Sequence, residues 1–252
     1  MSTVGTEPRQ PVLGFHEACK TFPDGTEAVR DVSFGVGKGE FVSVVGPSGC
    51  GKSTLLRLAA QLTPLTGGSI ERSLDNIGYV FQDPTLLPWR TVRRNIELLG
   101  ELTGLAKQER QSLAQDAIRL VGLDGFENHY PAALSGGMKM RVSLARGLTL
   151  RPKLFLLDEP FGALDEITRS GLNDELTRLF AAEQFAAVFI THSITEAVFL
   201  SSRVLVMSAR PGRIIGQFDV PVPFPRRPEF RFEREFSQIA EQVSNALREG
   251  YG

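Results

Sequence analysis

The sequence predicts an α/β fold built around a mostly parallel β-sheet. Short apolar segments, such as Phe41–Val45, Lys153–Leu157 and Ala187–Ile190, each precede a stretch with helical periodicity. Strands that are apolar on both faces and alternate with helices are typical of a parallel sheet that helices cover on both sides. The chain has 252 residues, of which 42% are hydrophobic, and this is enough for one sizeable domain or a main domain with a smaller insert.

The first elements are expected to form an antiparallel β part ahead of this sheet. Residues 12–20 and 29–36 show partial alternation of apolar and polar residues, and the Pro-Asp-Gly sequence between them is a turn signal. We therefore expect two strands with a hairpin-like connection, preceded by a flexible lead at residues 1–11. The strand Phe41–Val45 then leads into a glycine-rich turn and a helix, and a further short strand is expected at Ile77–Phe81.

A helical stretch interrupts the alternation of strands and helices. The pattern is helical from about residue 90 to 148, and it is clearest in the amphipathic segment Lys107–Val121. We therefore expect an inserted α-helical subdomain at about 88–148. Arg203–Met207 and Gly212–Val220 are expected as late strands.

The last part of the chain is expected to be a linker and a helix. The prolines of the Pro/Arg-rich segment 221–228 lack amide hydrogens and cannot continue a ladder, so this segment is predicted to be a linker. The sequence thus predicts a single domain over 1–220, followed by a linker and a C-terminal helix over 221–252. One apolar stripe of this helix is formed by Phe236, Ile239, Val243 and Leu247.

Charge and hydropathy exclude several classes of protein. The chain carries 28 basic and 29 acidic residues, a formal charge of −1, so no broad nucleic-acid-binding surface is expected. It contains no run of 18 apolar residues that could span a bilayer as a helix, and Met1–Gln10 lacks the apolar stretch of a secretory signal. Two cysteines, Cys19 and Cys50, are too few for a disulfide framework. These observations predict a cytoplasmic chain.

The glycine-rich turn after the third strand carries the most specific motif. Gly46-Pro-Ser-Gly-Cys-Gly-Lys-Ser53 fits G-x-x-x-x-G-K-[ST], in which glycines let backbone amides turn toward a triphosphate. Lys52 is expected to reach the β- and γ-phosphates and the Ser53 hydroxyl to bind Mg²⁺, at the positive N-terminus of the next helix. Cys50 occupies a variable position and is predicted to be a small filler, not a nucleophile. The residues of this motif that are predicted to bind ATP are Gly46, Pro47, Ser48, Gly49, Cys50, Gly51, Lys52, Ser53 and Thr54.

A carboxylate pair follows the apolar strand that begins near Lys153. Asp158 ends this strand and can hold Mg²⁺ through water, and Glu159 beside it can polarise an attacking water. Because phosphoryl transfer depends on such positioning and on neutralisation of charge, the pair is the expected partner of the phosphate motif.

Further motifs occur in a fixed order around these two. They are Tyr79-Val-Phe-Gln82, Leu134-Ser-Gly-Gly-Met138 and Thr191-His192, and Asp158 opens the segment Asp-Glu-Pro-Phe-Gly-Ala-Leu-Asp165. The ordered set resembles the ATP-binding cassette (ABC) transporter ATPases. The resemblance implies a P-loop NTPase (RecA-like) core that binds and hydrolyses ATP with Mg²⁺.

The resemblance implies a role for each matched position. Phe22 matches the aromatic residue that stacks on adenine, and Gln82 matches the Q-loop glutamine that reaches Mg²⁺ and the attacking water. Glu159 resembles the catalytic base and His192 the switch histidine at the γ-phosphate, and Asp165 lies in the D-loop that lines the dimer contact. The implied Mg²⁺ ligands are Ser53, Gln82 and Asp158. The signature residues, which would act on the nucleotide bound by a second copy, are Leu134, Ser135, Gly136, Gly137 and Met138.

Some positions depart from the common family pattern. Met138 and Met140 stand where many cassettes have glutamine, and Met138 resembles the nitrate/sulfonate/taurine importer group. Ser193 stands where aspartate is common, and Ser193-Ile-Thr-Glu196 is predicted to form a capping box for the next helix. Phe22 in place of tyrosine keeps the stacking face and loses a hydroxyl.

A single cassette without a membrane domain resembles the separate ATPase subunit of a bacterial importer. Phe81–Val92 and the tail from Val220 resemble the nitrate/sulfonate/taurine group, although importers of pyrimidine precursors share much of this pattern. The resemblance implies a homodimer on ATP binding and permease subunits in the membrane. It also implies indirect contact with a periplasmic or lipid-anchored solute-binding protein, a peripheral position at the cytoplasmic face of the inner (plasma) membrane, and no nucleic acid. A soluble non-transport ABC ATPase is an alternative, but such proteins usually carry a second cassette or a long coiled coil.

Residues 86–92 are the predicted coupling surface for the permease. Leu86, Leu87 and Trp89 are apolar and are followed by Arg90, and interfaces often use aromatic and arginine anchors. Ordinary packing within the loop is the alternative interpretation of the same residues.

Overall fold

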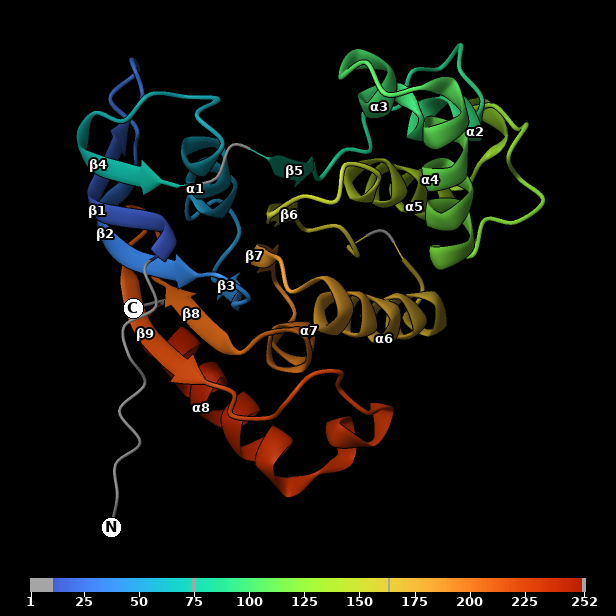
Figure 1. Ribbon diagram of the computed structural model, residues 1–252. Coiled ribbons are helices and arrows are strands. Elements are labelled where there is room, and N and C mark those ends of the chain that lie inside the picture. Colours follow the sequence, from blue (N-terminus) through green and yellow to red (C-terminus); the bar gives the residue numbers. More distant parts are fainter. Residues whose placement is uncertain (1–10, 74–75, 163, 251–252) are drawn as a thin grey trace.

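The computed structural model describes residues 11–73, 76–162 and 164–250, and it has two β-sheets with helices packed against them (Figure 1). Apart from Pro11, the predicted flexible lead at 1–11 lies outside the described residues. The strands are β1 (Pro11–Thr21), β2 (Glu27–Gly37), β3 (Phe41–Val45), β4 (Gly67–Arg72), β5 (Ile77–Val80), β6 (Leu154–Asp158), β7 (Ala186–Thr191), β8 (Arg203–Met207) and β9 (Ile214–Asp219). The helices are α1 (Lys52–Ala59), α2 (Val92–Ile96), α3 (Leu98–Leu102), α4 (Lys107–Leu120), α5 (Gly136–Leu148), α6 (Glu166–Glu183), α7 (Ile194–Leu200) and α8 (Arg234–Glu249), with 3-10 turns at Pro131–Ala133 and Pro228–Phe232.

The larger sheet has the strand order β5-β6-β7-β3-β8-β9. The first five strands are mutually parallel, and β9 runs antiparallel to β8. All residues of β3, β6 and β7 are buried, as expected for strands covered on both faces. The predicted α/β fold with a mostly parallel sheet is therefore confirmed.

The two faces of this sheet support two separate apolar cores. Alternate residues of one strand divide between them, since Phe41 and Val45 lie in one cluster and Val42 and Val44 in the other. Helices α5 to α8 cover the first cluster, and α1 with β1 and β2 covers the second. Packing on both faces of the sheet positions the ends of these strands, where the candidate site lies.

The N-terminal strands form a separate antiparallel sheet with the order β2-β1-β4. The hairpin of β1 and β2 agrees with the sequence prediction, whereas β4 was not predicted. Only Ile70 is apolar within β4, so its sequence lacks the alternation that indicates a strand, and its pairing with β1 decides its conformation. The late strand predicted from Gly212 begins two residues later, at Ile214, because Gly212 belongs to a loop that approaches β2.

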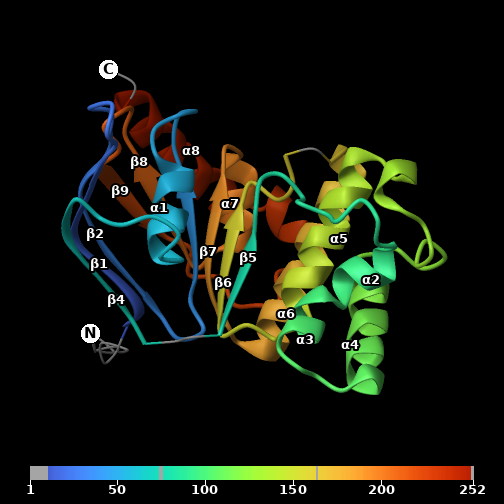
Figure 2. The same ribbon diagram turned by 90° about the horizontal axis from the view of Figure 1, so that it is seen from above.

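Helices α2 to α5 pack together beside β5 and β6, on the side of the molecule opposite the N-terminal sheet (Figure 2). They occupy residues 92–148 of the chain, so helices are present where the sequence predicts the helical insert. The C-terminal helix α8 buries Phe236, Ile239 and Val243 in the first core cluster, with Leu247 partly buried against it. None of the helices in the described part of the chain is long and apolar enough to cross a membrane.

Candidate functional site

The glycine-rich motif forms the turn between β3 and α1, where Gly49 and Gly51 have φ angles of 74° and 108°. A Cβ atom on Gly51 would lie 2.4 Å from the carbonyl oxygen of Ala28 in β2, so this position requires glycine for both conformation and space. Lys52 opens α1 and is 5% exposed. Its Nζ donates to the carbonyls of Gly46 and Pro47 at 2.8 and 2.9 Å, which holds the ammonium over the loop.

The other residues of this motif form the loop between β3 and α1. Ser48 and Gly49 are exposed, while Cys50 is 1% exposed. Burial raises the pKa of the Cys50 thiol, although nearby Lys52 and Arg210 oppose this shift. A buried thiol with a raised pKa is a poor nucleophile, which agrees with its predicted role as a filler.

Ser53 and Asp158 meet beneath the loop, with the Ser53 hydroxyl donating to Oδ1 of Asp158 at 2.9 Å. Asp158 is 3% exposed, and burial raises the pKa of its carboxyl, while the Ser53 hydrogen bond lowers it and nearby Glu159 raises it further. A buried carboxylate beside a hydroxyl suits Mg²⁺, which takes oxygen ligands and is usually held by one or two carboxylates together with phosphates and waters. No group of three His, Cys, Asp or Glu side chains that could hold a metal by itself occurs among the residues described.

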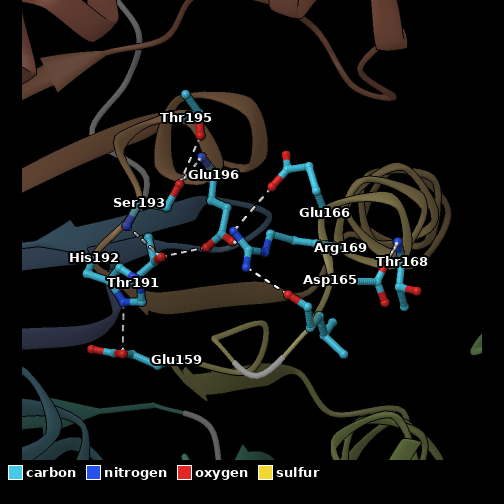
Figure 3. Close-up of polar contacts among 11 residues, drawn as sticks. Glu159, Asp165, Glu166, Thr168, Arg169, Thr191, His192, Ser193, Thr195 and Glu196 are labelled. Atoms are coloured by element: carbon cyan, nitrogen blue, oxygen red, sulfur yellow. Dashed lines mark hydrogen bonds and ion pairs between the residues drawn. The ribbon is translucent and has the colours of Figure 1, made fainter. Parts of the chain in front are cut away.

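Glu159 and His192 lie together at the ends of the neighbouring strands β6 and β7 (Figure 3). His192 Nδ1 is 3.0 Å from Oε2 of Glu159. The Glu159 backbone has a φ of 46°, and its amide donates to the carbonyl of Ile190 at 3.0 Å. A non-glycine residue in the left-handed region is uncommon, and here it turns the Glu159 side chain out of the strand direction toward the histidine.

The loop after His192 is fixed by a network that the sequence did not predict (Figure 3). Ser193 caps α7 by accepting the amide of Glu196 at 3.3 Å, but the Glu196 side chain does not return to Ser193. It accepts the Thr191 hydroxyl at 2.5 Å and pairs with Nε of Arg169 at 3.5 Å. The predicted capping box is therefore wrong in its second half, because Arg169 and the Thr191 hydroxyl compete for the carboxylate.

Arg169 extends this network to the segment that precedes α6. Its Nη2 donates to the carbonyl of Leu164 at 2.8 Å. Asp165 next to it accepts the amide of Thr168 at 2.9 Å as the N-cap of α6, and this hydrogen bond lowers the pKa of the Asp165 carboxyl. The predicted D-loop and the loop of His192 are thus joined through one arginine.

The signature segment begins helix α5, away from the phosphate loop of the same chain (Figure 1). Ser135 is the N-cap and accepts the amide of Met138 at 3.2 Å, and Leu134 is 6% exposed. Ser135 and Gly136 are exposed, and Gly137 and Met138 are partly so. No polar contact among the described residues joins this segment to Lys52. The start of the signature is therefore exposed at the surface of the chain.

Phe22 and Gln82 lie at the periphery of the site. Phe22 is partly buried at the β1–β2 turn, packs against the second core cluster, and has Nζ of Lys20 5.4 Å from its ring centroid. Gln82 is exposed two residues after β5, the neighbour of β6. The described polar contacts do not connect either residue to Asp158 or Glu159, so their predicted roles stay predictions.

The segment that follows Gln82 forms an exposed aromatic surface. Trp89 is 71% and Tyr130 is 52% exposed, and with Arg90, Thr91 and Arg94 they line a hollow of about 440 Å³. The buried side chain of Asn95 shapes this loop from below. Its amide nitrogen donates to the carbonyls of Leu87, Arg90 and Thr91, and its oxygen accepts the Leu87 amide at 2.8 Å.

A phosphate loop joined to a serine–aspartate pair and a glutamate–histidine pair at parallel strand ends defines a nucleoside triphosphatase. The family model described as "ABC transporter" matches residues 29–162, so the chain belongs to the ABC transporter family. It is 44% identical over 234 residues to a taurine import ATP-binding protein of Rhizobium johnstonii, covering 87% of this chain and 88% of that protein. It is 47% identical over 215 residues to a nitrate import ATP-binding protein of Synechococcus elongatus, covering 82% of this chain and 32% of that longer protein.

A solved structure extends the comparison to the fold. A dimeric ATP-binding cassette in a post-hydrolysis state, bound to ADP and Pi, is similar with a TM-score of 0.76 and 29% identity, covering 84% of this chain and 100% of that one. The protein is accordingly an ATP-binding, ATP-hydrolysing subunit of the ABC transporter family.

Proposed function

We propose that this chain powers the uptake of a small anion, such as nitrate, a sulfonate or taurine, through a separate membrane permease. Its similarity to import ATP-binding proteins for nitrate and taurine, at 47% and 44% identity, supports an importer and this class of cargo. On this proposal two copies dimerise around ATP at the cytoplasmic face of the membrane. A solute-binding protein delivers the cargo on the other side.

ATP binding rests on the loop and the strand ends. Lys52 neutralises the β- and γ-phosphates, and the backbone amides at the start of α1 add their partial positive charge. Ser53, Asp158 and Gln82 would hold Mg²⁺, which neutralises phosphate charge when bound. Phe22 stacks on the adenine ring at the turn of the N-terminal sheet.

The 3.0 Å contact between Glu159 and His192 carries the proposal for hydrolysis. The Glu159 carboxylate accepts a proton from the attacking water, and the turned backbone at this residue aims it away from the strand. His192 holds the carboxylate on one side and reaches toward the γ-phosphate on the other. The signature residues of the second copy close the site, with the amides after Ser135 directed at the γ-phosphate.

The hollow around Trp89 is the proposed permease contact. It combines an exposed tryptophan and tyrosine with two arginines, a composition that favours anchoring of a partner segment. The loop that carries Trp89 begins after Gln82 in sequence, so displacement of this loop by the permease would be passed along the chain to Gln82.

The test is Glu159→Gln, which keeps the shape of the side chain and removes its basicity. We expect ATP binding to persist, an ATP-dependent dimer to accumulate on size-exclusion chromatography, and turnover to fall by about 10²–10⁴-fold. The matched control is Glu183→Gln, an exposed glutamate at the end of α6, which should turn over like the wild type. Wild-type turnover in Glu159→Gln would refute the assignment of the base.

The cargo is tested separately with the intact transporter reconstituted in vesicles. We expect nitrate, taurine or an alkanesulfonate to stimulate ATP hydrolysis, with orotate as the pyrimidine comparison. Stimulation by orotate alone would overturn the proposed class of cargo and leave the ATPase assignment intact.

A further inference from the structure

The loop between β8 and β9, residues 208–213, contacts the phosphate loop directly. Arg210 donates from Nε and Nη2 to the carbonyl oxygen of Gly49, at 3.1 and 2.8 Å. Both donors of one guanidinium therefore converge on a single backbone acceptor within the motif that binds phosphate.

The backbones of β2, the phosphate loop and the β8–β9 loop meet at this point, and their contacts fix the β8–β9 loop next to the site. Gly212 donates to the carbonyl of Ala28 and accepts the amide of Arg30, both at 3.0 Å, so the loop is tied to β2. A Cβ atom on Gly212 would lie 2.2 Å from the carbonyl oxygen of Cys50, so only glycine lets the loop approach the phosphate loop so closely. The position of Arg210 is therefore set by backbone contacts on both sides.

The C-terminal end of α8 also contacts the β8–β9 loop. The amide of Ala209 donates to the carbonyl of Gly250, which caps α8, at 3.1 Å. Figure 2 shows the end of α8 close to the β8–β9 pair and to the strands of the N-terminal sheet. Arg210 thus extends from a loop that is supported by β2 and by α8.

Arg210 also lies near the turn that carries Phe22. The pKa of Asp24 in that turn is lowered, mainly by hydrogen bonds from Thr26, and the charge of Arg210 adds to the effect. The charge of Arg210 similarly lowers the pKa of Cys50 against the stronger effect of burial. No carboxylate within 4.0 Å pairs with Arg210 among the described residues. The positive charge of Arg210 therefore acts on the phosphate loop and on the turn that carries Phe22.

The Gly49–Cys50 peptide is held from both sides: Arg210 donates to the Gly49 carbonyl, and the Cys50 amide donates to the carbonyl of Pro47 at 3.3 Å. Gly49 has a φ of 74°, and a glycine in this region can rotate its following peptide at little cost. In a trans peptide the carbonyl and the next amide point in opposite directions, so the Arg210 contact on the Gly49 carbonyl keeps the Cys50 amide on the side of Pro47, within the turn of the phosphate loop. A flipped peptide would present a partially negative oxygen to the phosphates in place of an amide.

We propose that Arg210 is a positioning residue that holds the Gly49–Cys50 peptide of the phosphate loop in the orientation that receives the β-phosphate. This inference rests on the proposed ATP site at that loop. Because bound phosphates themselves order the loop, Arg210 acts on the free protein and on the binding step. The chemical step at Glu159 then proceeds unchanged once nucleotide is bound.

The test compares Arg210→Gln and Arg210→Lys with Arg213→Gln in the same loop. Arg213 pairs with Asp31 at 3.2 Å on the surface and does not touch the phosphate loop, so it controls for the loss of one positive charge. We expect Arg210→Gln to raise KM for ATP roughly fivefold to tenfold, the scale of one charge-assisted hydrogen bond with an exposed donor, with kcat within about twofold. Arg210→Lys retains one donor and should recover part of the affinity, and Arg213→Gln should match the wild type.

Two further measurements separate positioning from a structural role. The dissociation constants of ATP and ADP should rise by the same factor in Arg210→Gln, since both nucleotides carry the β-phosphate, while the thermal midpoint stays at the wild-type value. An unchanged KM, or a fall in kcat together with the thermal midpoint, would overturn the role of Arg210. Failure of the wild type to bind or hydrolyse ATP, or wild-type binding and turnover in Lys52→Ala, would instead overturn the proposed site.

Discussion

Replacement of Glu196 by alanine should loosen the loop that carries His192. The change removes the acceptor of the Thr191 hydroxyl and one partner of the Arg169 guanidinium, in a side chain that is 6% exposed. A buried donor left without a partner costs about 1–3 kcal/mol, and Arg169 is a quarter exposed and keeps its bond to Leu164, so we expect a total loss of about 2–3 kcal/mol. For a chain of this length that corresponds to a fall of about 4–10 °C in the thermal midpoint.

Differential scanning calorimetry and steady-state ATPase assays measure the two consequences of Glu196→Ala. The kcat should fall with the midpoint, since Thr191 directly precedes His192. Glu196→Gln is the milder variant, because burial raises the pKa of Glu196 and a neutral amide avoids desolvating a charge while still accepting from Thr191. Glu166→Ala is the control. It removes the exposed carboxylate near the same arginine and should change stability by less than about 0.5 kcal/mol. Wild-type stability and kcat in Glu196→Ala would refute the reasoning.

Three other perturbations follow from the same structure. Asp158→Asn should abolish Mg²⁺-dependent ATP binding and raise the thermal midpoint of the nucleotide-free protein at neutral pH. Because the pKa of Asp158 is raised in the folded protein, the ionised carboxylate lowers stability above that pKa. In a pH series, the stability gained by Asp158→Asn should therefore vanish as the pH falls toward 3.8. A gain that stays constant with pH would contradict this cause. Trp89→Ala should leave the hydrolysis of the isolated subunit unchanged and weaken permease-stimulated hydrolysis, and equal loss of both would remove the proposed contact. Phe236→Ala should lower the free energy of unfolding in urea by about 3–5 kcal/mol, since the Phe236 side chain is 5% exposed and its ring centroid lies 5.3 Å from that of Phe230. A loss below about 1 kcal/mol would show that α8 does not unfold together with the core.

The sequence was sufficient where short-range chemistry decides the structure. The phosphate loop needs glycine at fixed offsets and a lysine at the helix start, so its residues could be placed before any coordinates. The parallel core was equally predictable, because strands such as β7 are apolar at every position but the last, Thr191.

Long-range pairing decided the features that the sequence did not reveal. Strand β4 carries one apolar residue and forms because β1 offers it a free edge. Glu196 occupies the capping-box position but turns to Thr191 and Arg169, and Arg169 is 27 residues away in sequence. Arg210 lies in a polar loop with no periodicity, and only folding brings it to Gly49. A guanidinium in a Gly/Pro turn after the last parallel strand is the one signal that could have drawn attention to it.

The carbonyl of Gly250 has a practical consequence for anyone who purifies this protein. A segment fused beyond α8 would lie close to Gly250, whose carbonyl accepts the amide of Ala209, and the next residue, Arg210, contacts the phosphate loop. A fusion that displaces Gly250 is therefore expected to change the affinity for nucleotide. A cleavable tag at the other terminus, or comparison of both fusions, keeps the measured affinity a property of the protein.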